Sequence, residues 1–397
     1  MKRVWAIAGI AVRNAVRSRV VVVMLGLLLL AIVGLPLTIK SDGTVSGEVQ
    51  VLLRYTLGAV TILLSLATLW AGCAAVAMEV QDRQIHLVMT KPVRAGELWL
   101  GKWVGLMTFN AGLLVVAGAV TYGLLLWNLR GERANPQVRE EILVARRVVR
   151  PEPSPVYSIP PGRAVRFTFR LPQTPVADRP LILRYRFASS LTDKNPVACV
   201  FVAGAPARAD RWQQQQFSAP GGVHTLAIPP ALVGADRTLT VDIGNIHPVP
   251  LTMVFDPRDG LAVLSYAGTF AGNFARTLAV VWCGLGFFAA VAVTMGSLFS
   301  LPVAALVAGE VVLLAHIGAS LRTLAGDESW LRGVYVVLYW LTKPWQMPDP
   351  LAKLATGELV SWGWLGAVGL WQVLVCGGVL AAVGTWFFNR RELGLPA

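Results

Sequence analysis

The fold is decided by the stretch MEVQDRQIHLVMTKPVRAGELWLGKWVG, residues Met78–Gly105. It is charged, contains a proline, and lies between two uncharged runs, Tyr55–Met78 and Trp103–Leu129. Each run is long enough for a membrane-spanning helix, which needs about 20 apolar residues. The sequence therefore predicts a short loop, 79–102, at which the chain leaves the membrane and then returns to it.

The composition is that of a membrane protein. The chain has 397 residues, is 55% hydrophobic and only 14% charged, and contains 14 tryptophans. Soluble domains are nearer a quarter charged, and tryptophan gathers at membrane interfaces. Further apolar runs bring the expected number of transmembrane helices to six. The expected spans are Val20–Ile39, Tyr55–Met78, Trp103–Leu129, roughly 277–299, roughly 303–323 and Leu359–Asn389.

Residues 2–18 are expected to form an amphipathic helix along the inner membrane surface. Arg13 and Arg17 lie opposite an apolar stripe on this helix. The helix is too long for the basic region of a cleaved signal, and no small-residue cleavage site follows it. The stripe consists of Val4, Ile7, Ala8, Ala11, Ala15 and Val16.

Lysine and arginine set the expected orientation, because short cytoplasmic segments carry an excess of both. The first nineteen residues, the 79–102 loop and the C-terminal tail are basic, whereas the 40–54 loop holds only Lys40 and Arg54. Both termini and the 79–102 loop are therefore expected in the cytoplasm. A basic inner face against anionic membrane lipid accounts for the net charge of +13, so no nucleic-acid partner is expected.

Residues 130–262, between the third and fourth spans, are expected to form an extracytoplasmic antiparallel β-sandwich. In RAVRFTFRL, Val165, Phe167 and Phe169 alternate with polar residues, as in a half-buried strand. Only Val138–Val149, at the start of the domain, is expected to be helical. Further strands are expected at LILRYRF (181–187), VACVFVAG (197–204), HTLAIPP (224–230), TLTVDIGN (238–245) and LTMVFDP (251–257).

The predicted protein is thus mostly α-helical and membrane-embedded, with one inserted β-domain. Residues 1–129 hold the amphipathic helix and three spans, and 130–262 hold the β-domain. Residues 263–397 hold the last three spans, with a re-entrant or interfacial segment near 329–345, whose apolar run is too short to cross.

Catalytic motifs are missing from the sequence. It contains no phosphate-binding GxxxxGK[ST], no HExxH and no CxxC. Of the four cysteines only Cys199 falls outside the spans, so neither a disulfide framework nor a cysteine metal site is expected. His224 and His247 could meet on the sandwich and hold copper or zinc, although histidines without such a role are commoner. We expect no catalytic residue and no metal in this chain.

Two intramembrane polar residues, Glu310 and His316, lie in the fifth span. A carboxylate at that depth is costly and indicates a function by default. A proton relay would need a chain of such groups, and only His316 and the membrane-edge Arg322 are near in sequence. The alternative that we favour is a structural Glu310 that faces a neighbouring helix.

The basic faces of the predicted strands leave two interpretations open. They could bind an anionic partner, or they could be solvated surface. The arginines concerned are Arg166, Arg170, Arg184 and Arg186.

The 79–102 loop resembles the same region of ATP-binding-cassette (ABC) transporter permeases of the ABC-2 exporter type. Such permeases commonly show a Glu ending the second span, an Arg shortly after, a KPV or RPV triplet, and a GK entering the third span. Glu79, Arg83, Lys91–Val93 and Gly101–Lys102 match this order.

The rest of the resemblance covers residues 1–128 and about 265–397. It includes the basic N-terminal helix, a hairpin between spans four and five, and the closing FFNRRELG, 387–394. The β-domain stands where minimal members of the family have a short loop.

The resemblance implies a permease subunit of the bacterial inner membrane, without nucleotide site or cofactor of its own. A cytoplasmic ABC ATPase subunit would bind ATP and Mg²⁺, and a second permease chain, identical or related, would complete the assembly. Residues 80–91 would form the coupling helix that docks in a groove of the ATPase. The expected ATPase contacts are Glu79, Asp82, Arg83, His86, Lys91 and Pro92.

Three functions are then compared. The first is a permease subunit that couples ATP hydrolysis by a separate ATPase to export, or to mechanical work on an extracytoplasmic protein partner. The alternative is a non-transporting membrane anchor or scaffold whose β-domain binds a partner. A membrane-bound enzyme is the least supported, because no catalytic cluster is present.

Overall fold

In the computed structural model the chain divides into two compact units. The first comprises Met1–Val138, Ala271–Thr356 and Val360–Ala397, and the second comprises Arg139–Phe270 with Gly357–Leu359. We call them the helical unit and the β-unit. The structure describes residues 2–17, 19–38, 45–81, 94–131, 144–153, 156–191, 195–204, 211–257, 259–324 and 349–390.

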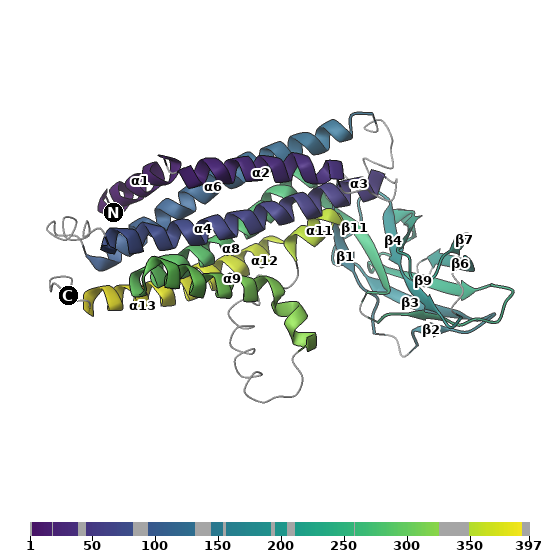
Figure 1. Cartoon of the computed structure of the whole chain (residues 1–397). Coiled ribbons are helices and arrows are strands. Elements are labelled where there is room, and N and C mark those ends of the chain that lie inside the picture. Colours follow the sequence, from purple (N-terminus) through teal and green to yellow (C-terminus); the bar gives the residue numbers. More distant parts are fainter. Residues whose placement is uncertain are drawn as a thin grey trace. The chain divides into compact units, whose positions relative to one another are not determined.

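The helical unit contains long helices that lie alongside one another (Figure 1). Two of its segments, η1 and η3, are π-helical turns set within longer helical stretches. The elements are α1 (Lys2–Arg17), α2 (Arg19–Thr38), α3 (Val45–Val51), η1 (Leu52–Thr56), α4 (Leu57–Gln81), α6 (Ala95–Asn128), α8 (Phe270–Leu298), α9 (Leu301–Leu324), α11 (Pro350–Ala355), α12 (Trp362–Val368), η3 (Gly369–Cys376) and α13 (Gly377–Arg390).

Four helical stretches among the described residues are long and apolar enough to cross a membrane. They coincide with the second, third, fourth and sixth predicted spans, and they confirm the prediction of a membrane protein. The bent pair α1 and α2 adds a fifth if the two count as one span, and the described apolar part of α9, Leu301–Leu313, is shorter. Six spans therefore stay a prediction. The four stretches are Gly47–Glu79, Ala95–Asn128, Phe270–Leu298 and Trp362–Asn389.

Two helices begin earlier than the uncharged runs suggest. Helix α6 starts at Ala95, ahead of the uncharged run that begins at Trp103, because the Glu97 carboxylate accepts a 3.0 Å hydrogen bond from the Arg94 backbone N–H and caps the helix. Helix α8 starts at Phe270, directly after strand β11 ends at Thr269. The re-entrant segment expected near 329–345 lies outside the described residues.

The β-unit consists of three antiparallel sheets. The first has the order β1 (Val144–Val149), β11 (Leu261–Thr269), β4 (Leu181–Tyr185), β8 (His224–Ile228). The second has the order β2 (Ser158–Ile159), β10 (Met253–Phe255), β5 (Phe187–Ser189). The third has the order β3 (Ala164–Arg170), β9 (Thr238–Asn245), β6 (Val197–Gly204), β7 (Trp212–Ser218).

One apolar core joins the three sheets. The ring of Tyr185 in the first sheet lies 4.7 Å from that of Phe201 in the third, and Phe167 in the third lies 6.1 Å from Phe255 in the second. The inward positions predicted for β3, Phe167 and Phe169, are buried. The alternating pattern thus correctly identified the antiparallel, two-faced strands.

The helix expected at Val138–Val149 is wrong where the structure describes it, because Val144–Val149 is strand β1. Backbone pairing with β11 overrides the helical composition of this segment. The boundary expected at residue 262 also differs, since β11 continues to Thr269. Strand β7, which contains the run of glutamines, was not expected as a strand.

Candidate functional site

The end of α4 and the first turns of α6 are joined by an ion pair between Glu79 and Lys102. The Lys102 ammonium group also donates a 2.6 Å hydrogen bond to the carbonyl oxygen of Ala75. Its side chain is only 7% exposed, whereas that of Glu79 is 24% exposed. We call Ala75, Glu79, Glu97 and Lys102 the α4–α6 junction. The junction holds together the two helix ends that flank residues 82–93.

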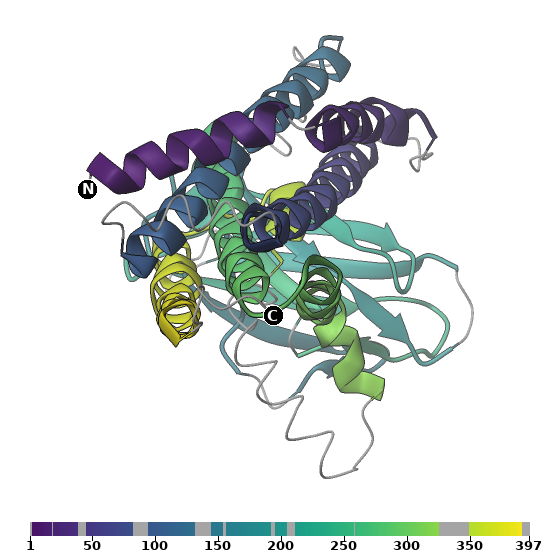
Figure 2. The same ribbon diagram turned by 60° about the vertical axis from the view of Figure 1, so that its left-hand side comes forward.

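Helix α1 packs on this junction. An added Cβ at Gly101 would lie 2.7 Å from the Cβ of Ile7, and one at Gly105 would lie 2.8 Å from the Cβ of Ala11. Glycines at these positions therefore let α1 approach α6 closely, as Figure 2 shows for the helix at the N-terminus. An ion pair of 3.8 Å between Arg3 and Glu97 adds to this contact.

This packing changes the interpretation of the N-terminal stripe. Ala8 is buried, and Val4, Ile7 and Ala11 are partly buried on the α6 side. The stripe was expected to face the membrane surface, but most of it packs against protein.

Indole N–H groups tie α6 to α8. Trp103 donates a 2.9 Å hydrogen bond to the Gly286 carbonyl, and Trp282 donates a 3.0 Å hydrogen bond to the Met107 carbonyl. Trp99 donates to the Thr294 hydroxyl at 3.1 Å. Such bonds fix two helices against sliding, because each satisfies a polar group at one position along the neighbouring helix.

The ends of several helices gather around the junction. One buried cluster contains Val76 of α4, Ala95 of α6, Val293 of α8 and Phe388 of α13. The C-terminal ends of α4, α8 and α13 thus lie at the same end of the helical unit as the start of α6 (Figure 1). The four helices therefore meet in one packed cluster beside the junction.

Of the six expected ATPase contacts, one lies at this junction among the described residues. Glu79 is described and is engaged by Lys102. The other five expected contacts lie outside the described residues. These are Asp82, Arg83, His86, Lys91 and Pro92.

Of the two polar residues expected within the fifth span, Glu310 is exposed on α9 and forms no ion pair with another described residue. The side chain of His316 lies outside the described part of the chain.

In the β-unit, arginines are paired with acids. Arg166 makes two hydrogen bonds to Asp242, of 2.7 and 2.9 Å, and this bonding holds the pKa of the guanidinium above its usual value. Arg170 lies 3.3 Å from Glu152. Arg184 is paired as well, so three of the four arginines considered have an acidic partner, which favours a solvated surface. Arg186 is exposed and forms no ion pair with another described residue.

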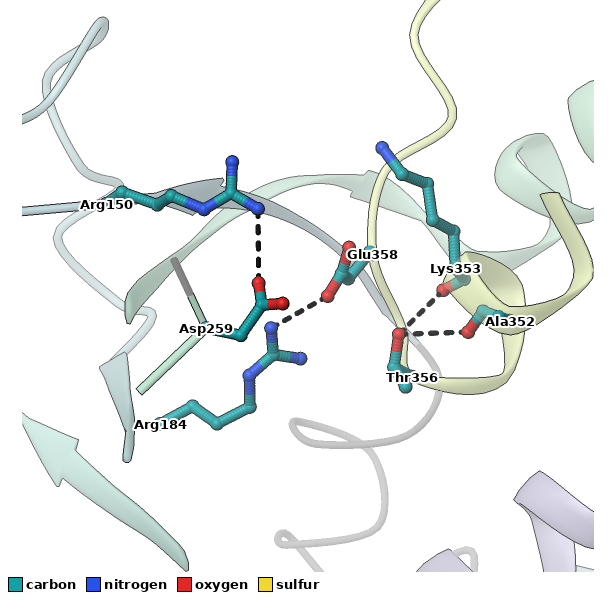
Figure 3. A network of polar contacts seen from close by, with 7 residues as sticks. All are labelled: Arg150, Arg184, Asp259, Ala352, Lys353, Thr356 and Glu358. Atoms are coloured by element: carbon teal, nitrogen blue, oxygen red, sulfur yellow. Dashed lines mark hydrogen bonds and ion pairs between the residues drawn. The ribbon is translucent and has the colours of Figure 1, made fainter. Parts of the chain in front are cut away.

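A further ion pair holds a short segment against the first sheet. Arg184 of β4 donates a 2.8 Å hydrogen bond to Glu358, as Figure 3 shows. The backbone of residues 357–359 runs parallel to β1, because the Arg146 N–H donates to the Gly357 carbonyl and the Leu359 N–H donates to the Arg146 carbonyl, each at 2.8 Å. We call Gly357–Leu359 the edge segment. Two residues, Val360 and Ser361, separate it from the start of α12.

The two histidines considered for a metal each have a backbone partner. His224 bonds the Ala219 carbonyl at 2.8 Å, and His247 Nδ1 accepts a 3.2 Å hydrogen bond from the Ala198 N–H. No group of three or more potential ligands gathers among the described residues.

Sequence reasoning missed the partner of Glu79, the glycine contacts with α1 and the edge segment. The sequence did contain a signal for the Glu79–Lys102 pair, because an acid and a base flank a short loop between two predicted helices. The edge segment gave no signal, because it pairs with a strand more than two hundred residues earlier in the chain.

A comparison with protein-family models found no match for this chain. A search of curated proteins found no relative either.

Proposed function

We propose that this chain is the membrane-spanning permease subunit of an ABC transporter. It couples ATP hydrolysis by a separate cytoplasmic ATPase to export, or to mechanical work on an extracytoplasmic partner. Residues 80–91 form the coupling helix, and a second permease chain completes the assembly in the bacterial inner membrane.

The observation that carries this proposal is the α4–α6 junction. Glu79 and Lys102 clamp the two ends of the charged loop, so a force on that loop acts on two apolar helices at once. The pair also supports a rigid lever instead of a flexible linker, since separating the helix ends would leave the buried Lys102 ammonium group without its counter-ion. Family resemblance supplies the identity of the ATPase.

The tryptophan bonds supply the next step of the proposed coupling. They connect α6 to α8. Helix α8 in turn begins at the residue after β11 ends, so no flexible linker separates it from the β-unit along the chain. This continuity supports transmission of motion from the loop toward the β-unit.

The test is purification of the chain with its ATPase in a gentle detergent, with Asp82 and Arg83 reversed in charge (Asp82→Lys, Arg83→Glu). Truncation of a buried charged contact costs about 2–5 kcal/mol, so the recovered ATPase should fall at least about tenfold. The matched control leaves the loop unchanged and introduces one positive and one negative charge at exposed positions of strand β7 (Gln213→Lys, Gln215→Glu). Wild-type recovery of the ATPase by the reversed variant would put the membrane-anchor function ahead.

A further inference from the structure

Three tryptophans of the helical unit each lie against a cationic side chain. Such contacts are attractive within about 6 Å of the ring centre, because the ring face carries partial negative charge. We call them the boundary pairs, and they are Arg130 with Trp127 at 3.9 Å, Arg276 with Trp362 at 5.5 Å, and Lys353 with Trp364 at 5.5 Å, measured from the cationic centre to the ring centre.

The boundary pairs lie at one end of the helical unit, away from the α4–α6 junction. The Tyr122 ring, near the end of α6, lies 5.4 Å from the Phe274 ring, near the start of α8. The Asn273 side chain in turn accepts a 2.8 Å hydrogen bond from the Val360 N–H, just before α12. Three of the apolar stretches thus end or begin here, at the depth where tryptophan and arginine meet lipid headgroups.

The cations of the boundary pairs are not balanced by acids. None of Arg130, Arg276 and Lys353 forms an ion pair with another residue that the structure describes. The orientation expected from the sequence places this end outside the cytoplasm, where short segments carry fewer lysines and arginines. The excess of cytoplasmic cations therefore does not account for these three.

Arg276 is held in a fixed orientation. Its Nε donates a 3.0 Å hydrogen bond to the Gly272 carbonyl, and its guanidinium lies against Trp362, which is 70% exposed. Both terminal NH2 groups are left without a partner among the described residues. A planar guanidinium with both groups available binds two oxygens of a phosphate through parallel hydrogen bonds.

We propose that Arg276 and Trp362 form a binding site for the phosphate headgroup of an anionic phospholipid. The site goes beyond the proposed function, since it requires only that the helical unit cross a membrane. Further along the same helical stretch Leu370 is 58% and Leu374 65% exposed, so acyl chains find an apolar surface below the headgroup. A free phosphate ion would leave that surface and the Trp362 ring uncovered.

Charge decides between anionic and zwitterionic lipid. A zwitterionic headgroup brings an ammonium group of its own close to the boundary pairs, and the described residues there supply no free acid to receive it. An anionic headgroup brings only negative charge, and Lys353 and Arg130 add to its attraction at the same end of the unit.

Retention of lipid tests the site. The protein is exchanged into bilayer discs with equal parts of phosphatidylglycerol and phosphatidylcholine, and the lipids that stay bound on release into the gas phase are counted by native mass spectrometry. We expect retained phosphatidylglycerol to exceed phosphatidylcholine. Arg276→Gln should lower this preference at least about tenfold, because hydrogen bonds to charged groups are lost. Trp362→Leu should lower it about two- to fivefold.

The matched control is Arg54→Gln. Arg54 is exposed on η1, at the same end of the unit because α4 runs from there to the junction, and it lies over no tryptophan among the described residues. This variant should retain lipid as the wild type does. An equal loss in Arg54→Gln and Arg276→Gln would show that net charge alone attracts the lipid, and would overturn the site.

Two further measurements separate the remaining outcomes. Arg276→Lys keeps the charge without the paired hydrogen bonds and should fall between the wild type and Arg276→Gln, so it carries the test with Trp362→Leu if the Gln variant does not fold. Excess inorganic phosphate should leave the bound lipid in place. Displacement of the lipid by phosphate would assign the site to a soluble anion, and a wild type without preference for phosphatidylglycerol would also refute the proposal.

Discussion

Lys102 of α6 forms an ion pair with Glu79 of α4 while its ammonium group lies almost entirely out of solvent. The same group also bonds the Ala75 carbonyl, so two of its three donors are used within one turn of α4. A buried charge is stable only with such partners. The pair therefore fixes the separation between the helix ends that flank the 82–93 segment.

Breaking this pair from one side should be strongly destabilising. Glu79→Leu leaves the Lys102 charge buried without its counter-ion and should lower the free energy of unfolding by about 3–5 kcal/mol. Lys102→Met should cost less, because Glu79 is the more exposed partner. The double variant Glu79→Leu/Lys102→Met should recover most of the loss. Unfolding in detergent gives the double-mutant cycle, and additive effects of the two changes would show that the residues do not interact.

The close approach of α1 to α6 should depend on Gly105. In Gly105→Ala the new methyl group would lie 2.8 Å from the Ala11 Cβ and 3.0 Å from the Ala8 carbonyl oxygen, so α1 must move. We expect a lower melting temperature and faster tryptic cleavage at Arg13 and Arg17.

Gly112→Ala is the matched control for this prediction. Gly112 lies on the same helix, and its added Cβ would meet nothing within 4 Å. Alanine is favoured over glycine within a helix by roughly 0.5–1 kcal/mol, so this change should be neutral or stabilising. Equal behaviour of the two variants would mean that α1 does not rest on Gly105.

The strands that the sequence predicts and those that it does not predict differ in the interactions that form them. Strand β3 was predictable because Phe167 and Phe169 alternate with polar residues, which is a property of the segment alone. Strand β7 is mostly glutamine and becomes a strand through its pairing with β6. Strand β1 is buried at consecutive positions, Val144 and Ala145, so it shows no alternation. Pairing between distant segments cannot be derived from local pattern.

The candidate site was predictable to a similar extent. Charge between two apolar runs marked the 79–102 loop, and Glu79 was identified within it. The role of Gly101 and Gly105 was not, because it depends on which helix crosses there. The sequence also placed the N-terminal stripe on the membrane, since an amphipathic pattern does not distinguish lipid from an apolar helix as the neighbour.

The edge segment should depend on its ion pair. Glu358→Gln removes the charge opposite Arg184, and these side chains are only 17% and 24% exposed. We expect the Leu359 amide, which donates to Arg146, to exchange hydrogen at least several-fold faster in this variant. The control is Asp259→Asn, which breaks the pair with Arg150, where the side chains are 68% and 64% exposed. Exposed pairs contribute about 0–1 kcal/mol, so the control should exchange as the wild type does. The opposite ranking would show that the edge segment is held by its backbone bonds alone.

The thiol of Cys199 should be inert in the folded β-unit. Burial raises its pKa from 9.0 to about 12, so the reactive thiolate is scarce at neutral pH. In a variant with Cys73, Cys283 and Cys376 replaced by alanine, a thiol reagent should label Cys199 only after unfolding. Rapid labelling of the native protein would show that the β-unit opens readily.

The same shift predicts a loss of stability in alkali. The folded state holds the Cys199 proton more tightly than the unfolded state, so the contribution is complete below about pH 9 and is lost as the pH rises toward about 12. Cys199→Ala removes this dependence, which comparison of the two melting curves between pH 8 and pH 11 would detect, within the range set by that pKa.

The orientation of the chain should place β7 and the 79–102 loop on opposite sides of the membrane. The basis is the excess of lysine and arginine in the loop and at both termini. Gln214 is exposed on β7, so Gln214→Cys should react with an impermeant maleimide added outside intact cells. Gln84→Cys in the loop should react only after the membrane is opened. Each cysteine is placed in the background without native cysteines, and opening the membrane serves as the positive control for both. Labelling of both positions from the same side would contradict the orientation, and residues 80–91 would then be out of reach of a cytoplasmic ATPase.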